Sequence, residues 1–310
     1  MAPTTLVTGA AGFAGSHLLE LLAAEQGPVV GWHRPGHQPP NVDAVWEPVD
    51  LMDRSAVAAA VARVRPAVVY HCAGAAHVGK AWAGATGALA TNVRATHYLL
   101  EGLRTAGVDA RVLIPGSALV YRPVNEPMTE NHALVPNSPY GLSKLSQELL
   151  AFHARSGRVH VMVARAFNHF GPRQDPAFAV SGFARQIARI EGGFQAPEIV
   201  VGNLEARRDL TDVRDTVRAY RMIVDRGASG RAYNVCSGRA FAIGEVLEML
   251  VARSHASIRV RVDPALFRPN DVPLVVGDPG RMRDELGWTP SIPFEQTLED
   301  TLNYWRAQTH

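Results

Sequence analysis

The 310-residue sequence has few cysteines, little excess charge and no long apolar run. Cys72 and Cys236 are too few for a disulfide framework or a cysteine-rich zinc site, so we expect a reducing, cytoplasmic location. A formal net charge of +2 is too small to indicate a nucleic-acid-binding protein, which typically carries a large excess of positive charge. No apolar stretch approaches the roughly 20 residues of a membrane span, and the first residues lack the pattern of a secretory leader. We therefore expect a globular chain without a nucleic-acid or membrane partner.

What the first half does contain is an alternation of short β-rich runs and helical patterns. The predicted strands are Thr5–Val7, Val29–Trp32, Ala44–Val49, Ala67–His71, Arg111–Pro115 and Val159–Ala164. The predicted helices are Gly15–Ala24, Arg54–Val64, Ala88–Thr105 and Tyr140–Ala154. Strand–helix–strand alternation predicts parallel pairing through right-handed crossovers, and therefore an α/β fold with a Rossmann-type doubly wound sheet.

After Phe170 the pattern changes, and glycine, proline and arginine become frequent. Helical segments at Phe183–Glu191, Asp212–Asp225 and Ile243–Ser254 are interleaved with short strands at Ala232–Val235 and Ile258–Val262. We predict a dinucleotide-binding domain over residues 1–166 and a smaller α/β substrate lobe over 167–310. Segments around 207–236 are candidates to return to the main sheet.

A glycine-rich turn joins the first predicted strand to the first predicted helix. Gly9, Gly12 and Gly15 stand three residues apart, with Phe13 and Ala14 between the last two. Glycines at this spacing let the backbone approach a pyrophosphate, which then sits on the unpaired N–H groups of the helix N-terminus. The alternative is a turn that only packs strand on helix, but the strand–turn–helix context favours a cofactor loop.

The end of the second strand bears on the choice of cofactor. NAD sites place an acid there for the ribose 2′-hydroxyl, but this chain has Trp32-His33-Arg34. Arg34 can pair with the 2′-phosphate of NADP, or it is simply a solvated arginine; NADP is favoured and NAD stays possible. Asp50-Leu51 is expected near the adenine, and Ala73-Gly74-Ala75 is expected to line the cofactor.

Tyr140 and Lys144 stand four residues apart, on one face of a helix that begins after Pro139. A phenol with a pKa of about 10 is a poor acid–base group at neutral pH, and a cation within roughly 4–6 Å can lower that pKa by about 1–3. The spacing alone also occurs by chance on exposed helices. Ser117 strengthens the catalytic interpretation, because it lies just past the C-terminal end of an apolar strand, and ligands of open α/β sheets bind at the C-terminal ends of the strands. We predict Ser117, Tyr140 and Lys144 as the catalytic set.

In this ordered set the chain resembles the extended short-chain dehydrogenases/reductases that act on nucleotide sugars. The matching motifs are Gly9/Gly12/Gly15, Asp50-Leu51, His71-Cys72-Ala73-Gly74, Asn92-Val93, Ser117-Ala118-Leu119-Val120-Tyr121, Tyr140/Lys144 and Arg165-Ala166-Phe167-Asn168. The resemblance implies that Asn92 belongs to the cofactor site and that the protein is a homodimer. No metal is expected, since the histidines show no ligand spacing.

The second half is similar to GDP-6-deoxy-D-mannose reductases within that family. The matching segments are residues 167–172, 201–205, 208–215, 233–238, 268–273 and 287–290. The likeness implies reduction of GDP-4-dehydro-6-deoxy-D-mannose at C4 to GDP-D-rhamnose. It also implies a set of substrate-binding residues, namely Ser117, Asn168, Arg208, Arg268 and Asp271. Arg185 is a further candidate, and the alternative is that it belongs to a solvated helix face.

Several related activities compete with this one. Sugar-nucleotide 4,6-dehydratases carry Asp-Glu after the serine, and GDP-fucose synthases use a cysteine in that region, whereas this chain has Ala118-Leu119. Neither residue can transfer a proton, which disfavours both activities. A 4-epimerase stays open because it needs the same Ser117/Tyr140/Lys144 set. A reductase forming GDP-6-deoxy-D-talose stays open because the configuration at C4 depends on how the substrate is bound. A non-catalytic NADP-binding module is the alternative of another class, since fold alone does not establish activity, but the intact set argues against it.

Overall fold

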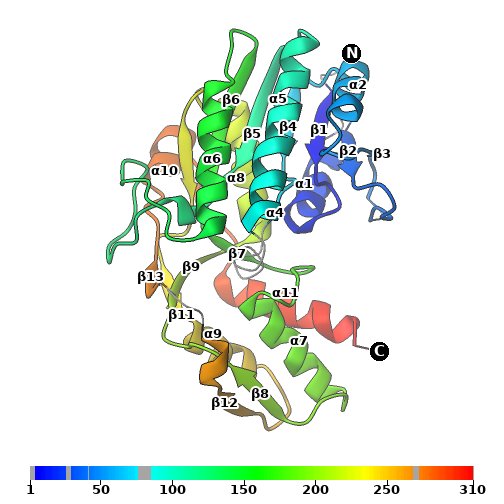
Figure 1. The fold of residues 1–310 in the computed structure, drawn as a ribbon. Helices are drawn as coiled ribbons and strands as arrows, with labels where there is room; N and C mark the ends of the chain where they lie inside the picture. The colour runs from blue at the N-terminus through cyan, green and yellow to red at the C-terminus, as the bar shows by residue number, and fades with distance from the viewer. Residues whose placement is uncertain (1–3, 26–28, 41, 76–84, 268–271, 310) are drawn as a thin grey trace.

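The computed structural model describes residues 4–25, 29–40, 42–75, 85–267 and 272–309, and its largest feature is a seven-stranded parallel sheet (Figure 1). The strand order is β10-β6-β5-β4-β1-β2-β3, and every pairing is parallel. The strands are β1 (Thr5–Thr8), β2 (Val29–His33), β3 (Val45–Pro48), β4 (Val68–His71), β5 (Ala110–Pro115), β6 (Val159–Ala166) and β10 (Ala232–Val235). The predicted Rossmann-type fold is confirmed.

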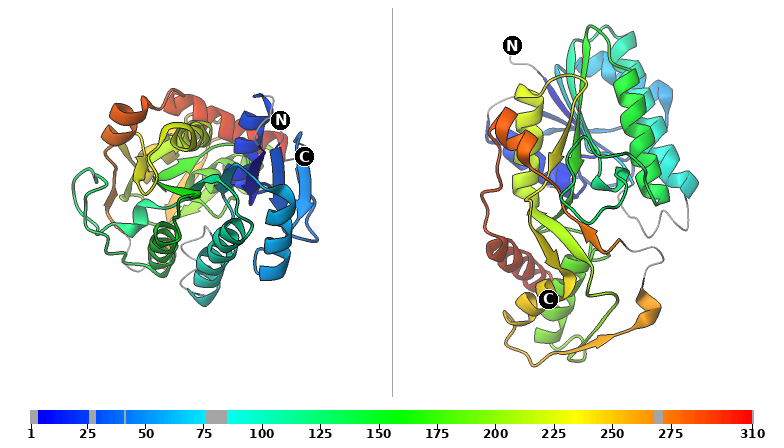
Figure 2. Two further views of the ribbon diagram at one scale, coloured as in Figure 1. Left: turned by 90° about the horizontal axis from the view of Figure 1, so that it is seen from above. Right: turned by 90° about the vertical axis from the view of Figure 1, so that its left-hand side faces the viewer.

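Helices cover both faces of this sheet (Figures 1 and 2). One face is covered by α1 (Phe13–Ala23) and α8 (Val213–Arg226), the other by α2 (Arg54–Val64), α5 (Ala95–Thr105) and α6 (Pro139–His153). Successive strand residues serve opposite cores, because side chains alternate along a strand: Leu6 packs with α2 and α5, and Val7 packs with α1 and α8. Burial on both faces explains why these strands have continuous apolar runs instead of an alternating pattern.

The helix predicted over Ala88–Thr105 is longer and contains an irregular turn. It begins with α4 (Ala85–Leu89), passes through a π-helical turn at Ala90–Arg94 and continues as α5. Asn92 lies in the π turn and is completely buried. Its amide oxygen accepts a hydrogen bond from the Ala75 backbone at 2.8 Å, and its nitrogen donates to the Ser143 hydroxyl at 2.9 Å. The π turn therefore fixes the loop that follows β4 against α6.

The smaller lobe lies below the carboxyl ends of the main strands in Figure 1. One of its sheets contains β11 (Ala240–Ala242), β9 (Arg207–Asp212), β13 (Leu274–Val275) and β7 (Asn168–Phe170), and the other pairs β8 (Glu198–Val201) with β12 (Arg259–Val262). Its core is covered by α7 (Ala179–Glu191), α9 (Ile243–Val251) and α11 (Phe294–Ala307), while α10 (Gly280–Leu286) packs on β10. Part of the segment 207–236 returns to the main sheet, as predicted: β9 lies in the smaller lobe, but α8 packs on the main sheet and β10 pairs with β6 in it.

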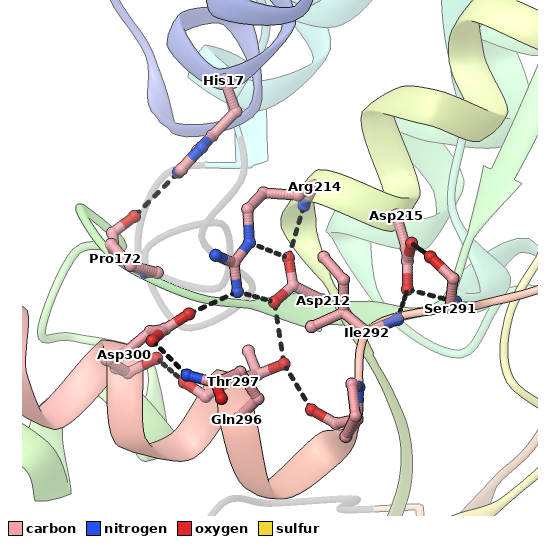
Figure 3. Close-up of polar contacts among 12 residues, drawn as sticks. His17, Pro172, Asp212, Arg214, Asp215, Ser291, Ile292, Gln296, Thr297 and Asp300 are labelled. Carbon is pink, nitrogen blue, oxygen red and sulfur yellow. Dashed lines mark hydrogen bonds and ion pairs between the residues drawn. The ribbon is translucent and has the colours of Figure 1, made fainter.

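Charged side chains fasten the two lobes together where β9 leads into α8 (Figure 3). Arg214 donates to the Asp212 carboxylate at 2.6 and 3.0 Å and to Asp300 of α11 at 2.7 Å. Thr297 of α11 donates to the same Asp212 carboxylate at 2.8 Å. Elsewhere in the junction, the His17 ring of α1 contacts the Pro172 carbonyl oxygen at 3.0 Å (Figure 3). These contacts fix the orientation of the lobe that closes the site described below.

Candidate active site

A cleft of about 480 Å³ lies between the carboxyl ends of the main strands and the smaller lobe. Its walls come from segments far apart in the sequence: the start of α1, the ends of β4, β5 and β6, the start of α6, and residues of the smaller lobe. Ligands of doubly wound sheets bind at the carboxyl ends of the strands, at the point where the strand order reverses, which here lies between β1 and β4. The cleft is therefore the candidate active site.

The glycine loop forms one wall of the cleft. Gly9 adopts a φ of +65°, and a Cβ there would lie 2.6 Å from the backbone of Ala73. A Cβ on Gly15 would lie 2.2 Å from the Gly9 carbonyl oxygen, so both positions require glycine. Gly12 is the N-cap of α1 and provides no side-chain cap. Gly12, Phe13 and Ala14 line the cleft, so the unpaired N–H groups of the helix start are available to an anion such as a diphosphate.

The other predicted cofactor residues differ in their position relative to the cleft. Gly74 and Ala75 line the cleft, and Asn92 supports their loop from behind. Arg34 is exposed immediately beyond β2. Asp50 is exposed too, and its carboxylate caps the turn before α2 by accepting the Met52 N–H at 2.9 Å, while Leu51 packs against the core.

Ser117, Tyr140 and Lys144 meet in the cleft. Ser117 follows β5 and begins a short 3-10 turn, Ala118–Val120. Ser138 caps α6 by accepting the Gly141 N–H, which fixes the start of the helix that carries Tyr140 and Lys144. The Lys144 ammonium donates to the Pro115 carbonyl at 2.8 Å and to the Gln147 amide oxygen at 2.9 Å.

Burial dominates the acid–base properties of this set. It raises the pKa of the Tyr140 phenol to about 12, and a hydrogen bond with Ser117 opposes that increase. It lowers the pKa of the Lys144 ammonium to about 8. The predicted lowering of the Tyr140 pKa is wrong in its net direction, because desolvation outweighs the hydrogen bond with Ser117, while the Lys144 ammonium is directed at Pro115 and Gln147. At neutral pH the site thus contains a protonated phenol beside a protonated lysine.

The predicted substrate-binding residues, unlike Ser117, Tyr140 and Lys144, do not all lie in the cleft. Asn168 lies on β7 and lines the cleft. Arg208 lies on β9, where its guanidinium donates to the Val272 carbonyl at 2.7 Å. Arg185 is exposed on α7 with its guanidinium over the Trp305 ring, and it is not among the residues lining the cleft. Arg268 and Asp271 lie outside the described residues.

Several residues that line the cleft were missed by the sequence reasoning, and they include Phe167, His169, Gln174, Phe178 and Tyr220. Gln174 is 6% exposed, and its amide nitrogen donates to the His169 carbonyl at 2.8 Å. Within the described part of the chain its amide oxygen has no hydrogen-bond partner, so it is a candidate acceptor for a ligand. Phe167 and His169 lie in a segment that carries the family resemblance, but no residue pattern marks Gln174, Phe178 and Tyr220. The place of these three residues beside the cleft follows only from the three-dimensional packing.

Two kinds of feature are absent from the ranges that the structure describes. They contain no group of three or more His, Cys, Asp or Glu side chains able to hold a metal ion. They also contain no helix that is both long and apolar enough to cross a bilayer.

A doubly wound sheet, a glycine loop opening α1 and a Ser/Tyr/Lys set at the strand ends together define a short-chain dehydrogenase/reductase with a second lobe. The family described as GDP-mannose 4,6 dehydratase matches residues 6–301. The chain belongs to this family of NAD(P)-dependent nucleotide-sugar enzymes.

Individual relatives share nearly the full length. GDP-6-deoxy-D-mannose reductase of Pseudomonas aeruginosa is 33% identical over 99% of both chains. The structure of RMD from P. aeruginosa complexed with NADPH is 32% identical, covers 99% of this chain and 100% of its own, and superimposes with a TM-score of 0.87. UDP-glucose 4-epimerase of Thermotoga maritima, solved with UDP-glucose, is 26% identical at the same coverage and TM-score.

Proposed function

We propose that this chain reduces the C4 ketone of GDP-4-dehydro-6-deoxy-D-mannose to GDP-D-rhamnose, with NADPH as the preferred cofactor. The observation that carries the proposal is the composition of the cleft around Ser117. Ala118 and Leu119, the next two residues, also line the cleft. Eliminating water across C5–C6 requires an additional acid and base, which neither side chain can provide. A single reduction by Ser117, Tyr140 and Lys144 is the chemistry that these residues support.

The cleft fits a dinucleotide cofactor at its α1 wall. The uncapped N-terminus of α1 suits the diphosphate, and Gly74 and Ala75 offer backbone with little side-chain bulk. When bound, the nicotinamide cofactor supplies the hydride that reduces the ketone carbon. We propose residues 1–166 as the cofactor domain and 167–310, apart from α8 and β10 at the main sheet, as the lobe for the GDP sugar. In this lobe Asn168, which lines the cleft, is suited to the sugar, and we assign the Arg208 guanidinium to the diphosphate.

In this proposal the protein residues manage the proton. Ser117 donates a hydrogen bond to the ketone oxygen, and the Tyr140 hydroxyl transfers its proton there as negative charge develops. A phenol with a pKa near 12 stays protonated until the alkoxide forms, which suits the reductive direction. The Lys144 ammonium would stabilise the resulting phenolate and help to hold the ribose of a bound cofactor, and solvent would return the proton to Tyr140.

The proposed activity is tested by incubating the protein with GDP-4-dehydro-6-deoxy-D-mannose and either NADPH or NADH. We expect stoichiometric NADPH oxidation and one product, identified by NMR as GDP-D-rhamnose. GDP-6-deoxy-D-talose as product would correct the configuration at C4. Interconversion of a UDP-hexose with its C4 epimer, without consumption of NAD(P)H, would replace the proposal with an epimerase; cofactor binding without any turnover would identify a binding module.

Arg34→Ala is expected to weaken the preference for NADPH. A guanidinium hydrogen-bonded to the 2′-phosphate contributes enough binding free energy that its loss lowers kcat/KM with NADPH by about 10–100-fold, with little change for NADH. Both constants are measured by absorbance at 340 nm, with Arg226→Ala as the control because Arg226 is an exposed arginine at the far end of α8. Equal losses with both cofactors would argue against contact with a 2′-phosphate.

We also propose that the protein works in the cytoplasm, where its two free cysteines stay reduced.

We further propose that the protein is a homodimer. Leu142 and Leu149 support pairing: they lie two helical turns apart on one face of α6 and are 49% and 57% exposed. Leu149→Glu is expected to shift the mass measured by light scattering from dimer to monomer. Glu295→Gln, a change on α11, is the control that leaves the mass unchanged. A wild-type protein that is monomeric at micromolar concentration would refute the proposal.

A further inference from the structure

Behind the cleft, a continuous chain of buried polar groups begins at Lys144. Gln147 lies one turn further along α6, is completely buried and accepts from the Lys144 ammonium through its amide oxygen at 2.9 Å. Its amide nitrogen donates to the Thr96 hydroxyl at 2.8 Å. Thr96 lies on α5, so Gln147 connects the lysine of one helix to the neighbouring helix.

The chain continues to the ends of two central strands. The His71 Nε2 atom lies 2.9 Å from the Thr96 hydroxyl, and its Nδ1 atom lies 2.8 Å from the hydroxyl of Thr8. Thr8 and His71 are register partners where β1 pairs with β4. Thr8, His71 and Thr96 are each at most 1% exposed, so water does not compete for these hydrogen bonds.

The hydrogen atoms in this chain have one consistent arrangement. The Thr96 hydroxyl donates its only hydrogen to the Asn92 carbonyl at 2.7 Å, so it accepts from both Gln147 and His71. His71 therefore carries its proton on Nε2, and Nδ1 accepts from Thr8. Burial and the nearby Lys144 charge keep this ring neutral by lowering its pKa to about 3. The arrangement leaves the Gln147 amide only one orientation, with its nitrogen toward Thr96 and its oxygen toward Lys144.

We propose that Gln147 is a positioning residue that acts through Lys144, an inference that rests on the proposed function. Lys144 has three N–H donors, and Gln147 and the Pro115 carbonyl occupy two of them. The third is left for the cleft, which Lys144 lines beside Tyr140. An acceptor on the buried side also favours the ammonium over the neutral amine, against the desolvation that acts on it.

The other titratable groups around Lys144 do not substitute for Gln147. Cys72 and His71 face it from the end of β4, and Tyr140 shares its helix. Burial raises the pKa of the Cys72 thiol to about 12, so at neutral pH it is an uncharged thiol. His71 is neutral as well. Within the described residues, therefore, the groups that stabilise the Lys144 charge are uncharged oxygen acceptors, and Gln147 is the side chain among them.

The sequence makes a direct test practical, because Lys80 and Lys144 are its only lysines. Protein labelled with 13C-lysine gives two Cε signals, and Lys80→Arg assigns them. We expect the wild-type Lys144 signal to titrate near pH 8. Gln147→Met removes the acceptor and is expected to lower that midpoint by about one pH unit or more. Gln147→Glu introduces an opposite charge and is expected to raise it by about 1–3 pH units.

Gln186→Met is the matched control, since Gln186 is half-buried on α7 away from the cleft, and it should leave the midpoint unchanged. Opposite shifts in the two Gln147 variants are not explained by a general loss of stability. An identical midpoint in wild type and both variants would overturn the inference, and Gln147→Glu keeps the test available if Gln147→Met fails to fold.

The titration needs no substrate: a shifted midpoint in a protein that reduces no keto-sugar would refute the proposed function alone. In an active enzyme, the basic limb of kcat/KM should shift with the midpoint.

Discussion

Tyr140→Phe is expected to lower kcat for keto-sugar reduction by about three orders of magnitude, while the protein stays folded and binds NADPH with similar affinity. The substitution removes only the hydroxyl that transfers a proton to the ketone oxygen. General acid catalysis by a positioned side chain typically contributes 10²–10⁴-fold, and Ala118 and Leu119, which follow Ser117 along the wall, have no proton to donate in place of the phenol. Stopped-flow absorbance at 340 nm measures the chemical step directly.

The control for this prediction is Tyr304→Phe, which removes a phenol from α11 next to Trp305 and should leave kcat unchanged. NADPH affinity is measured by fluorescence in both variants, so a binding defect is separated from a chemical one. Turnover of the keto-sugar that survives Tyr140→Phe would show that another group supplies the proton, and the mechanism assigned to Tyr140 would be wrong.

The fold could be predicted in large part because its signals are local. Apart from the exposed edge strand β3, the strands of the main sheet are buried, so each is a short apolar run with β-branched residues such as Val68–His71. The glycine loop must stand between the first strand and first helix because a Cβ at Gly9 or Gly15 would overlap backbone. The residues under these constraints stand close together in the sequence and form a recognisable motif, even though the backbone that excludes a Cβ at Gly9 belongs to Ala73.

The properties that escaped prediction depend on contacts between distant segments. Arg185 was a predicted substrate-binding residue, but packing of α7 against α11 places its guanidinium over Trp305. The direction of the Tyr140 pKa shift depends on how completely the lobe and sheet bury the phenol, which helical spacing does not reveal. Gln147 was unmarked because its partner Thr96 is 51 residues away in the sequence. Its role follows from the packing of α5 beside α6.

The second large effect is expected on stability, at a buried ion pair behind the catalytic helix. Arg165 of β6 donates to both carboxylate oxygens of Glu148 on α6, at 2.5 and 3.0 Å, and the two residues are 5% and 2% exposed. Arg165 also donates to the Tyr121 hydroxyl at 2.9 Å, which in turn donates to Asn234 of β10 at 2.6 Å. The pair thus joins α6, two sheet strands and the segment after Ser117.

Glu148→Leu leaves the Arg165 guanidinium buried without its counter-charge, and the free energy of unfolding is expected to fall by about 3–5 kcal/mol. Urea and thermal unfolding measure the change. The double variant Glu148→Leu with Arg165→Met removes both charges and should recover much of the loss, because the cost comes from the unpaired charge. Glu101→Ala breaks the Arg54–Glu101 pair, which has similar two-point geometry on the surface, and its effect should be far smaller because water solvates the released arginine. A double variant as unstable as Glu148→Leu would mean that the lost packing, and not the charge, determines stability at this position.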